Sequence, residues 1–219
     1  MRRMLSLIAT VLLVGPAGAQ QAGQNPQLDV EQRGNVTDVT IGGPGWGGVI
    51  KDIQAVRALP ADKDAEVIDK LQKDIDVNPP AYIYELVRRL CPSDPQRAMY
   101  LFAVAGSRMR YDAFRCVDES ALEGISTTLM SLPMPDCKAL ANDKLIMAQL
   151  RKSRDSKELF TSKASPWWMC SHGMEAMGAA LDKKSLQTSD WLKPESEWPA
   201  IRQTILGDLD ATVKTHASE

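Results

Sequence analysis

The chain has 219 residues, of which 44% are hydrophobic, and its 26 basic and 28 acidic side chains give a formal net charge of −2. This near balance, without a dense block of lysine or arginine, argues against nucleic acid and against an anionic membrane surface as partners. A chain of this length fits one domain with a sizeable hydrophobic core.

The first nineteen residues have the parts of a secretory signal peptide. Arg2 and Arg3 precede a short apolar run, and small residues lead up to a cleavage position after Ala19. The run is shorter than the roughly 20 apolar residues of a membrane-spanning helix, and no longer run follows it. We therefore expect residues 1–19 to be removed, and a mature protein without a membrane span to begin near Gln20 in the periplasm or outside the cell.

Residues 20–48 form a segment rich in Gln, Asn and Gly with few apolar residues. Its densest glycine stretch surrounds Trp46 and follows a weak alternating pattern over residues 36–41. These glycines lack the Lys-Ser/Thr pair of a phosphate-binding loop. The composition predicts a short flexible or β-hairpin-like arm, in which Trp46 either docks a partner or covers part of the core. Asn35 begins a glycosylation sequon, which leaves a eukaryotic secreted source open.

From residue 49 onward, apolar residues recur at helical spacing, and prolines or polar clusters separate the segments. The segments are 61–78, 81–91, 95–106, 119–132, 137–151, 167–181 and 195–211. No run is typical of a central strand. The pattern predicts an all-α fold, a chain of antiparallel helical hairpins forming a single domain over residues 49–213, with a tail over 214–219.

The clearest hairpin lies between residues 79 and 106. Its two apolar stripes consist of Ile83, Leu86, Val87 and Leu90, and of Ala98, Leu101, Phe102 and Ala105. Residues 93–96 fit a capping box that starts at Ser93, with Pro95 in the first turn of the second helix. Two helices with so short a connection pack antiparallel.

This hairpin resembles one unit of a Sel1-like or tetratricopeptide-like repeat. The similarity is carried by YELVRRL at residues 84–90 and by DPQRAMYLFAVAG at residues 94–106, and it extends over about residues 80–113. No second clean copy follows, whereas a solenoid normally needs about three. The resemblance implies helical-hairpin packing and a protein-binding groove, and it carries no enzymatic activity.

Four cysteines remain after signal cleavage: Cys91, Cys116, Cys137 and Cys170. An even number in an exported chain predicts two disulfides, and no CxxC motif indicates a thiol oxidoreductase. Three connectivities are open. We expect Cys91 to pair with Cys116 and Cys137 with Cys170, because these pairs close the shortest loops.

Residues 167–177 concentrate soft metal ligands. Met169, His172, Met174 and Met177 are of the types that suit Cu(I), but on one helix they fall on two faces. The simpler interpretation is burial, in which Met174 and Met177 fill core space while Gly173 and Gly178 permit close helix approach.

A third interpretation of the same segment is a contact surface for a partner. In that case Trp167, Trp168 and His172 would join Trp46 as binding residues.

Catalytic signatures are missing from the sequence. The chain has two histidines and neither a GxSxG nor an HExxH motif, and the adjacent Ser171 and His172 would point about 100° apart on a helix. We expect a non-enzymatic protein without a cofactor. It would bind a protein or peptide partner in the cell envelope, as a scaffold or as an inhibitor or immunity-type protein. The alternatives are a copper- or small-molecule-binding protein centred on residues 167–177, and an uncharacterised envelope hydrolase.

Overall fold

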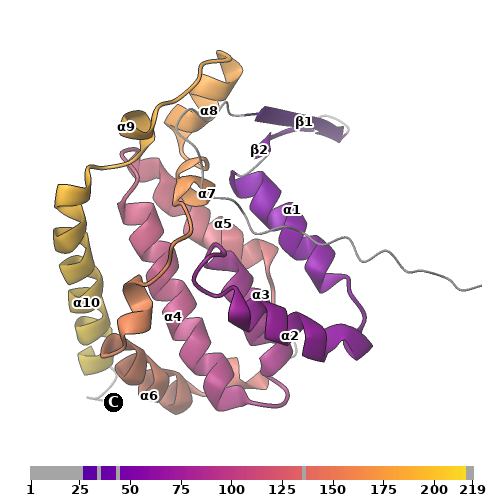
Figure 1. The fold of residues 1–219 in the computed structure, drawn as a ribbon, viewed down its shortest axis with the longest axis vertical. Coiled ribbons are helices and arrows are strands. Elements are labelled where there is room, and N and C mark those ends of the chain that lie inside the picture. The colour runs from indigo at the N-terminus through magenta and orange to yellow at the C-terminus, as the bar shows by residue number, and fades with distance from the viewer. Residues whose placement is uncertain (1–26, 34–35, 43–44, 135–136, 216–219) are drawn as a thin grey trace, which may run out of the picture.

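The computed structural model describes residues 27–33, 36–42, 45–134 and 137–215 (Figure 1). The expected signal peptide, its cleavage position near Ala19 and the last residues of the expected tail lie outside these ranges. The described chain is predominantly helical, which confirms the all-α class. None of the helices within these ranges is both long enough and apolar enough to cross a bilayer.

The helices and short 3-10 turns follow one another along the chain. The α-helices are α1 (Trp46–Arg57), α2 (Asp64–Lys73), α3 (Ala81–Leu90), α4 (Pro95–Phe114), α5 (Glu123–Ser131), α6 (Asp143–Arg154), α7 (Trp167–Cys170), α8 (Met174–Leu181), α9 (Thr188–Trp191) and α10 (Trp198–Thr215). The 3-10 turns are η1 (Ala61–Lys63), η2 (Glu119–Leu122), η3 (Lys138–Ala141), η4 (Lys157–Phe160) and η5 (Glu195–Glu197). Helix α1 thus begins at Trp46, three residues before the expected helical domain.

Helix α4 is the centre of the fold. Four consecutive residues, 98–101, are buried, so neighbours cover every side of the helix. These neighbours are α3, α6, α10 and η4, and Figure 1 shows α4 running between them. Asp94 caps the helix by accepting a hydrogen bond from Arg97 N at 3.0 Å, with Pro95 in the first turn. The cap is therefore Asp94, one residue after the expected Ser93.

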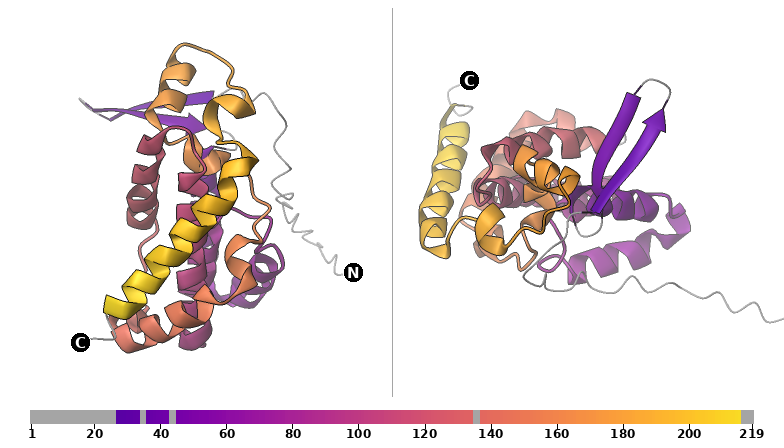
Figure 2. Two further views of the ribbon diagram at one scale, coloured as in Figure 1. Left: turned by 90° about the vertical axis from the view of Figure 1, so that its left-hand side faces the viewer. Right: turned by 90° about the horizontal axis from the view of Figure 1, so that it is seen from above.

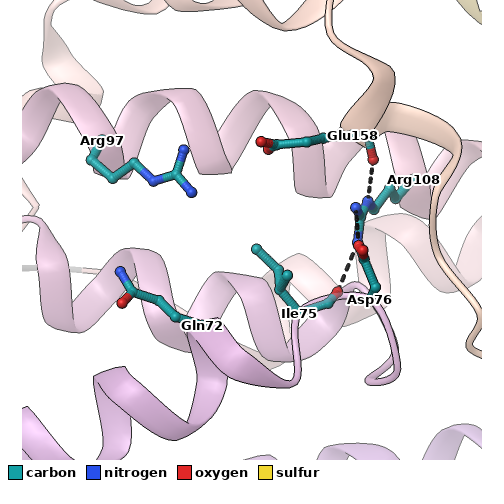
Figure 3. A pocket seen from close by; sticks show the side chains of 6 residues that line it. All are labelled: Gln72, Ile75, Asp76, Arg97, Arg108 and Glu158. Atoms are coloured by element: carbon teal, nitrogen blue, oxygen red, sulfur yellow. Dashed lines mark hydrogen bonds and ion pairs between the residues drawn. The ribbon is translucent and has the colours of Figure 1, made fainter.

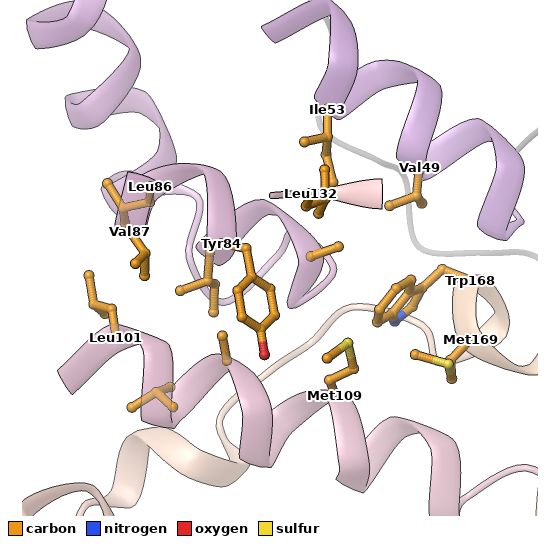
Figure 4. Packing of buried hydrophobic residues seen from close by; sticks show 14 of the residues in the cluster. Val49, Ile53, Tyr84, Leu86, Val87, Leu101, Met109, Leu132, Trp168 and Met169 are labelled. Atoms are coloured by element: carbon orange, nitrogen blue, oxygen red, sulfur yellow. The ribbon is translucent and has the colours of Figure 1, made fainter. Parts of the chain in front are cut away.

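The apolar stripes predicted for residues 83–90 and 98–105 meet in the main core (Figure 4). Leu86 and Leu101 are fully buried, as is Ile53 from α1. Trp168 from α7 enters the same cluster with 1% of its surface exposed. Burial of side chains of this size contributes about 1.5–3 kcal/mol each relative to exposure.

The disulfides join Cys91 to Cys137 and Cys116 to Cys170. The number of disulfides was predicted correctly, and the pairing of sequence neighbours was wrong. Cys91 precedes α4 and Cys116 follows it, and a helix of 20 residues is about 30 Å long. Disulfide-bonded residues have Cα atoms within about 7 Å, so the rigid helix keeps this pair apart.

The expected helix over residues 167–181 is broken at residues 171–173, between α7 and α8. The break turns α8 outward, so that Met174 and Leu181 are 66% and 61% exposed. The prediction that Met174 fills core space was therefore wrong. Gly173 does allow a close approach, whereas a Cβ at Gly178 would meet no atom within 4 Å.

Strands β1 (Gln27–Arg33) and β2 (Val36–Gly42) form a two-stranded antiparallel sheet in the segment expected as the arm. Strand β2 packs near α1, and β1 lies near α8. Figure 2 shows the pair extending away from the helices at the end of the molecule where α8 lies. The N-terminal segment thus presents backbone beyond the helical body.

Helix α10 packs along the outside of α4 and α6. Ile205 and Leu209, four residues apart on one face of the helix, are its buried residues. Polar contacts complete the attachment: Arg154 Nε lies 2.8 Å from Asp210 Oδ1 and Arg110 Nη2 lies 2.6 Å from Asp208 Oδ2.

Candidate partner-binding surface

Trp46 joins three segments at the start of α1. Its backbone nitrogen donates to Ser171 Oγ at 2.7 Å, and its indole nitrogen donates to Thr128 Oγ1 of α5 at 3.0 Å. The Ser171 hydroxyl in turn donates to the carbonyl oxygen of Trp168 at 3.2 Å. Ser171 is buried and fully engaged in this junction, and none of these hydrogen bonds pairs it with His172 as nucleophile and base.

His172 is half-buried beside this junction. Its ring centroid lies 5.2 Å from that of Trp46, with the planes tilted by 57°. Gly124 of α5 lies on another side, where an added Cβ would be 3.1 Å from the His172 ring. Burial lowers the pKa of His172 below the ordinary value of 6.5, although the Glu123 carboxylate opposes this shift. The imidazole is therefore neutral at pH 7, and it packs as an aromatic group against Trp46.

The two tryptophans proposed as contact residues lie inside the protein. Trp167 and Trp168 are each 1% exposed, and the Trp167 ring packs edge-on against Trp191 at 5.0 Å. Trp168 Nε1 donates to Asp112 Oδ2 at 2.8 Å. Their role in this fold is to close the core, and the surface offers neither of them to a partner.

Asp112 is a fully buried carboxylate that sequence reasoning missed. It pairs with Arg115, whose guanidinium also lies 4.3 Å from the Tyr111 ring and 4.8 Å from the Trp198 ring. Burial raises the pKa of Asp112, and the neighbouring Arg115 and the Trp168 hydrogen bond only partly oppose that shift. An Asp and an Arg three residues apart within an apolar helix face were the available sequence signal.

The residues considered for Cu(I) binding are spread between core and surface. Met169 is fully buried, whereas Met174 is 66% exposed. Met177 is half-buried on α8, and Cys170 is held in a disulfide. Within the described ranges, no group of three His, Cys, Asp or Glu side chains is placed to hold a metal ion. The fold thus separates methionine side chains that are close together in the sequence.

The exposed position of Met174 is held by contacts from η2. Asp118 Oδ2 accepts from Glu175 N at 2.8 Å, and Ser120 Oγ accepts from Met174 N at 2.9 Å. These bonds satisfy two of the unpaired backbone donors at the start of α8. Burial alone would raise the pKa of Asp118, but its hydrogen bonds outweigh burial and lower it. An added Cβ at Gly173 would lie 2.4 Å from Asp118 Oδ2, so glycine is required at this close approach.

The strands next to α8 leave backbone hydrogen-bonding groups without a strand neighbour. In the described part of the chain the sheet consists of β1 and β2 alone, so each strand has one outer edge. The register pairs Leu28 with Ile41 and Val30 with Val39. The outer edge of each strand thus offers backbone donors and acceptors to an added strand.

We define the hairpin-end surface as β1 and β2 together with Trp46, His172 and Met174. Sequence reasoning had singled out all three of these side chains. The structure places Trp46 at the start of α1, which packs near β2, and Met174 at the start of α8, which lies near β1. No protein-family model matches this chain, and neither a curated protein nor a solved structure matches it.

Proposed function

We propose that this chain is an exported, non-enzymatic helical protein that binds a protein or peptide partner in the cell envelope, as a scaffold or as an inhibitor. Two disulfides support an oxidising compartment such as the periplasm. The similarity of residues 80–113 to a Sel1-like unit also favours a protein-binding role, because helical-repeat proteins bind partners along their surfaces.

The observation that carries the proposal is the open sheet edge of the hairpin-end surface. A two-stranded sheet on its own is marginally stable in water, and a third strand with an apolar face stabilises it. An extended peptide can supply that strand, since its backbone would pair with the unpaired edge groups. Met174, which is 66% exposed, begins α8, and this helix lies near β1.

The partner segment should be extended, because only an extended backbone pairs along a strand edge. Backbone pairing along the strand edge would supply the affinity.

Affinity capture from envelope extract tests this assignment with matched variants. Val39→Pro and Met174→Glu should each reduce partner recovery, since the first removes a backbone N–H from β2 and the second places charge at the start of α8, which lies near β1. Met130→Glu is the control, because Met130 is also an exposed methionine (82%) but lies on α5.

The proposal requires the captured protein to bind purified wild type and the Met130→Glu variant equally, and to bind the other two variants at least tenfold more weakly. Equal binding to all four proteins would overturn the hairpin-end surface as the site. Failure of wild type to retain any saturable envelope partner would overturn the proposed function itself.

A further inference from the structure

A polar pocket lies between α2, α4 and η4. It has a volume of about 340 Å³. Six residues line it: Gln72, Ile75, Asp76, Arg97, Arg108 and Glu158. Figure 3 shows Arg97 and Gln72 facing one another from α4 and α2, while Asp76 and Arg108 lie at the other end. No residue of the hairpin-end surface takes part.

Arg108 makes one end of this pocket rigid. The side chain is 1% exposed, and Nε donates to the Glu158 carbonyl oxygen at 2.8 Å. Nη1 donates to the Ile75 carbonyl oxygen at 2.7 Å, and Nη2 donates to Asp76 Oδ1 at 2.6 Å and to Thr161 Oγ1 at 2.8 Å. These bonds hold the segment after α2 against η4. The charge of Arg108 is therefore already neutralised by protein groups.

Arg97 is in the opposite situation. Its guanidinium lies 5.2 Å from the Tyr100 ring centroid, and it forms no ion pair with any residue in the ranges that the structure describes. The Gln72 side chain across the pocket likewise has no hydrogen-bond partner within those ranges. This end of the pocket thus presents guanidinium and amide donors that a carboxylate can accept from.

Glu158 supplies the complementary charge. Its Oε2 accepts from the Tyr100 hydroxyl at 3.1 Å, and no basic side chain pairs with it in the described ranges. The carboxylate enters the pocket between its two ends (Figure 3). With Asp76 paired to Arg108, the groups that remain for a ligand are one cation, Arg97, and one anion, Glu158.

A ligand that satisfies both groups must carry both signs of charge. An anion alone would be repelled by Glu158, and a cation alone by Arg97. The volume is near the lower end of the roughly 300–1,000 Å³ typical of small-molecule sites, which limits the ligand to about two residues of peptide. We propose that this pocket binds a small zwitterionic peptide of dipeptide size, with its carboxylate on Arg97 and Gln72 and its ammonium group on Glu158.

Calorimetric titration of the full-length mature protein with the dipeptide Ala-Ala tests the proposal. N-acetyl-Ala-Ala lacks the ammonium group, and Ala-Ala amide lacks the carboxylate. Each blocked ligand should bind wild type about tenfold or more weakly than Ala-Ala, as expected for loss of one charge-assisted contact.

Two charge-removing variants assign the ends of the ligand. Arg97→Gln should weaken Ala-Ala about tenfold or more and abolish the preference for Ala-Ala over its amide. Glu158→Gln should abolish the preference for Ala-Ala over its acetylated form. Arg151→Gln is the matched control, because it removes an exposed positive charge on α6 outside the pocket and should leave binding unchanged.

Several results would overturn the proposal. These are no saturable binding of Ala-Ala, equal binding of all three ligands, or affinity unchanged by Arg97→Gln. Inorganic phosphate binding as tightly as Ala-Ala and insensitive to Glu158→Gln would identify a simple anion site instead. If Arg97→Gln fails to fold, the wild-type ligand series and Glu158→Gln still test the proposal. The hairpin-end surface is unaffected by any of these outcomes.

Discussion

Asp112→Ala should lower the free energy of unfolding by about 4–6 kcal/mol. The change leaves the Arg115 guanidinium, 5% exposed, without its carboxylate partner. Removing one member of a buried ion pair costs about 3–5 kcal/mol. Trp168 Nε1 also loses its acceptor, which adds about 1–3 kcal/mol for a buried unsatisfied donor. The two losses share a site, so their sum is an upper limit.

The same reasoning makes a less obvious prediction for a double variant. Burial raises the pKa of Asp112 despite Arg115, so the charged pair is not itself a strong source of stability. Asp112→Asn combined with Arg115→Met removes both charges and keeps an acceptor for the Trp168 indole. It should therefore cost less than about 2 kcal/mol, well below the single alanine change.

Urea unfolding monitored by tryptophan fluorescence, with both disulfides intact, measures these differences. Asp112→Asn alone serves as the reference if the alanine variant is largely unfolded. It keeps the indole acceptor, leaves Arg115 unpaired and should cost about 3 kcal/mol. An alanine variant within about 1 kcal/mol of wild type, or a double variant as unstable as the alanine variant, would refute the argument from a buried, mutually dependent pair.

Three further predictions concern stability. Replacing Cys91 and Cys137 by alanine opens a loop of 46 residues and should cost about 4 kcal/mol in urea unfolding, while a peptide map joining Cys91 to any other cysteine would contradict the fold. Leu86→Ala should cost about 2–5 kcal/mol, and a loss under about 0.5 kcal/mol would mean that this face is not core. Because burial lowers the pKa of His172, the unfolded chain binds the proton more tightly, and thermal stability should fall as pH drops below 6.5. His172→Gln should remove that part of the pH dependence. A variant whose stability depends on pH as wild type does would contradict this role of His172.

Disulfide pairing shows where sequence reasoning was incomplete. The composition correctly predicted two bonds, because an even number of cysteines in an exported chain pairs in an oxidising compartment. Shortest-loop reasoning then failed, since it treats the chain between Cys91 and Cys116 as flexible. Helix α4 occupies most of that interval as a rigid rod. The sequence predicted this helix only as far as residue 106, and its continuation to Phe114, which keeps Cys91 and Cys116 apart, is seen in the structure.

The segment over residues 167–177 shows the opposite case, in which local information was insufficient. The sequence analysis expected Met174 to fill core space because it assumed one continuous helix over residues 167–181. The break between α7 and α8 is stabilised by Asp118 and Ser120, which hydrogen-bond to the start of α8 from another segment. No pattern near residue 174 contains that information.

The sequence by itself determined the helical class and the core faces of the central helices, because hydrophobic periodicity is a local property of each segment. Leu86 and Leu101 are buried as their spacing predicted. Only the tertiary structure decided which of these side chains are exposed and which residues come together in a pocket. It buried Trp168, exposed Met174, and brought Arg97 and Glu158, which are far apart in sequence, to one pocket. Such juxtapositions depend on how the helices pack against each other, and helical spacing within one segment does not specify that packing.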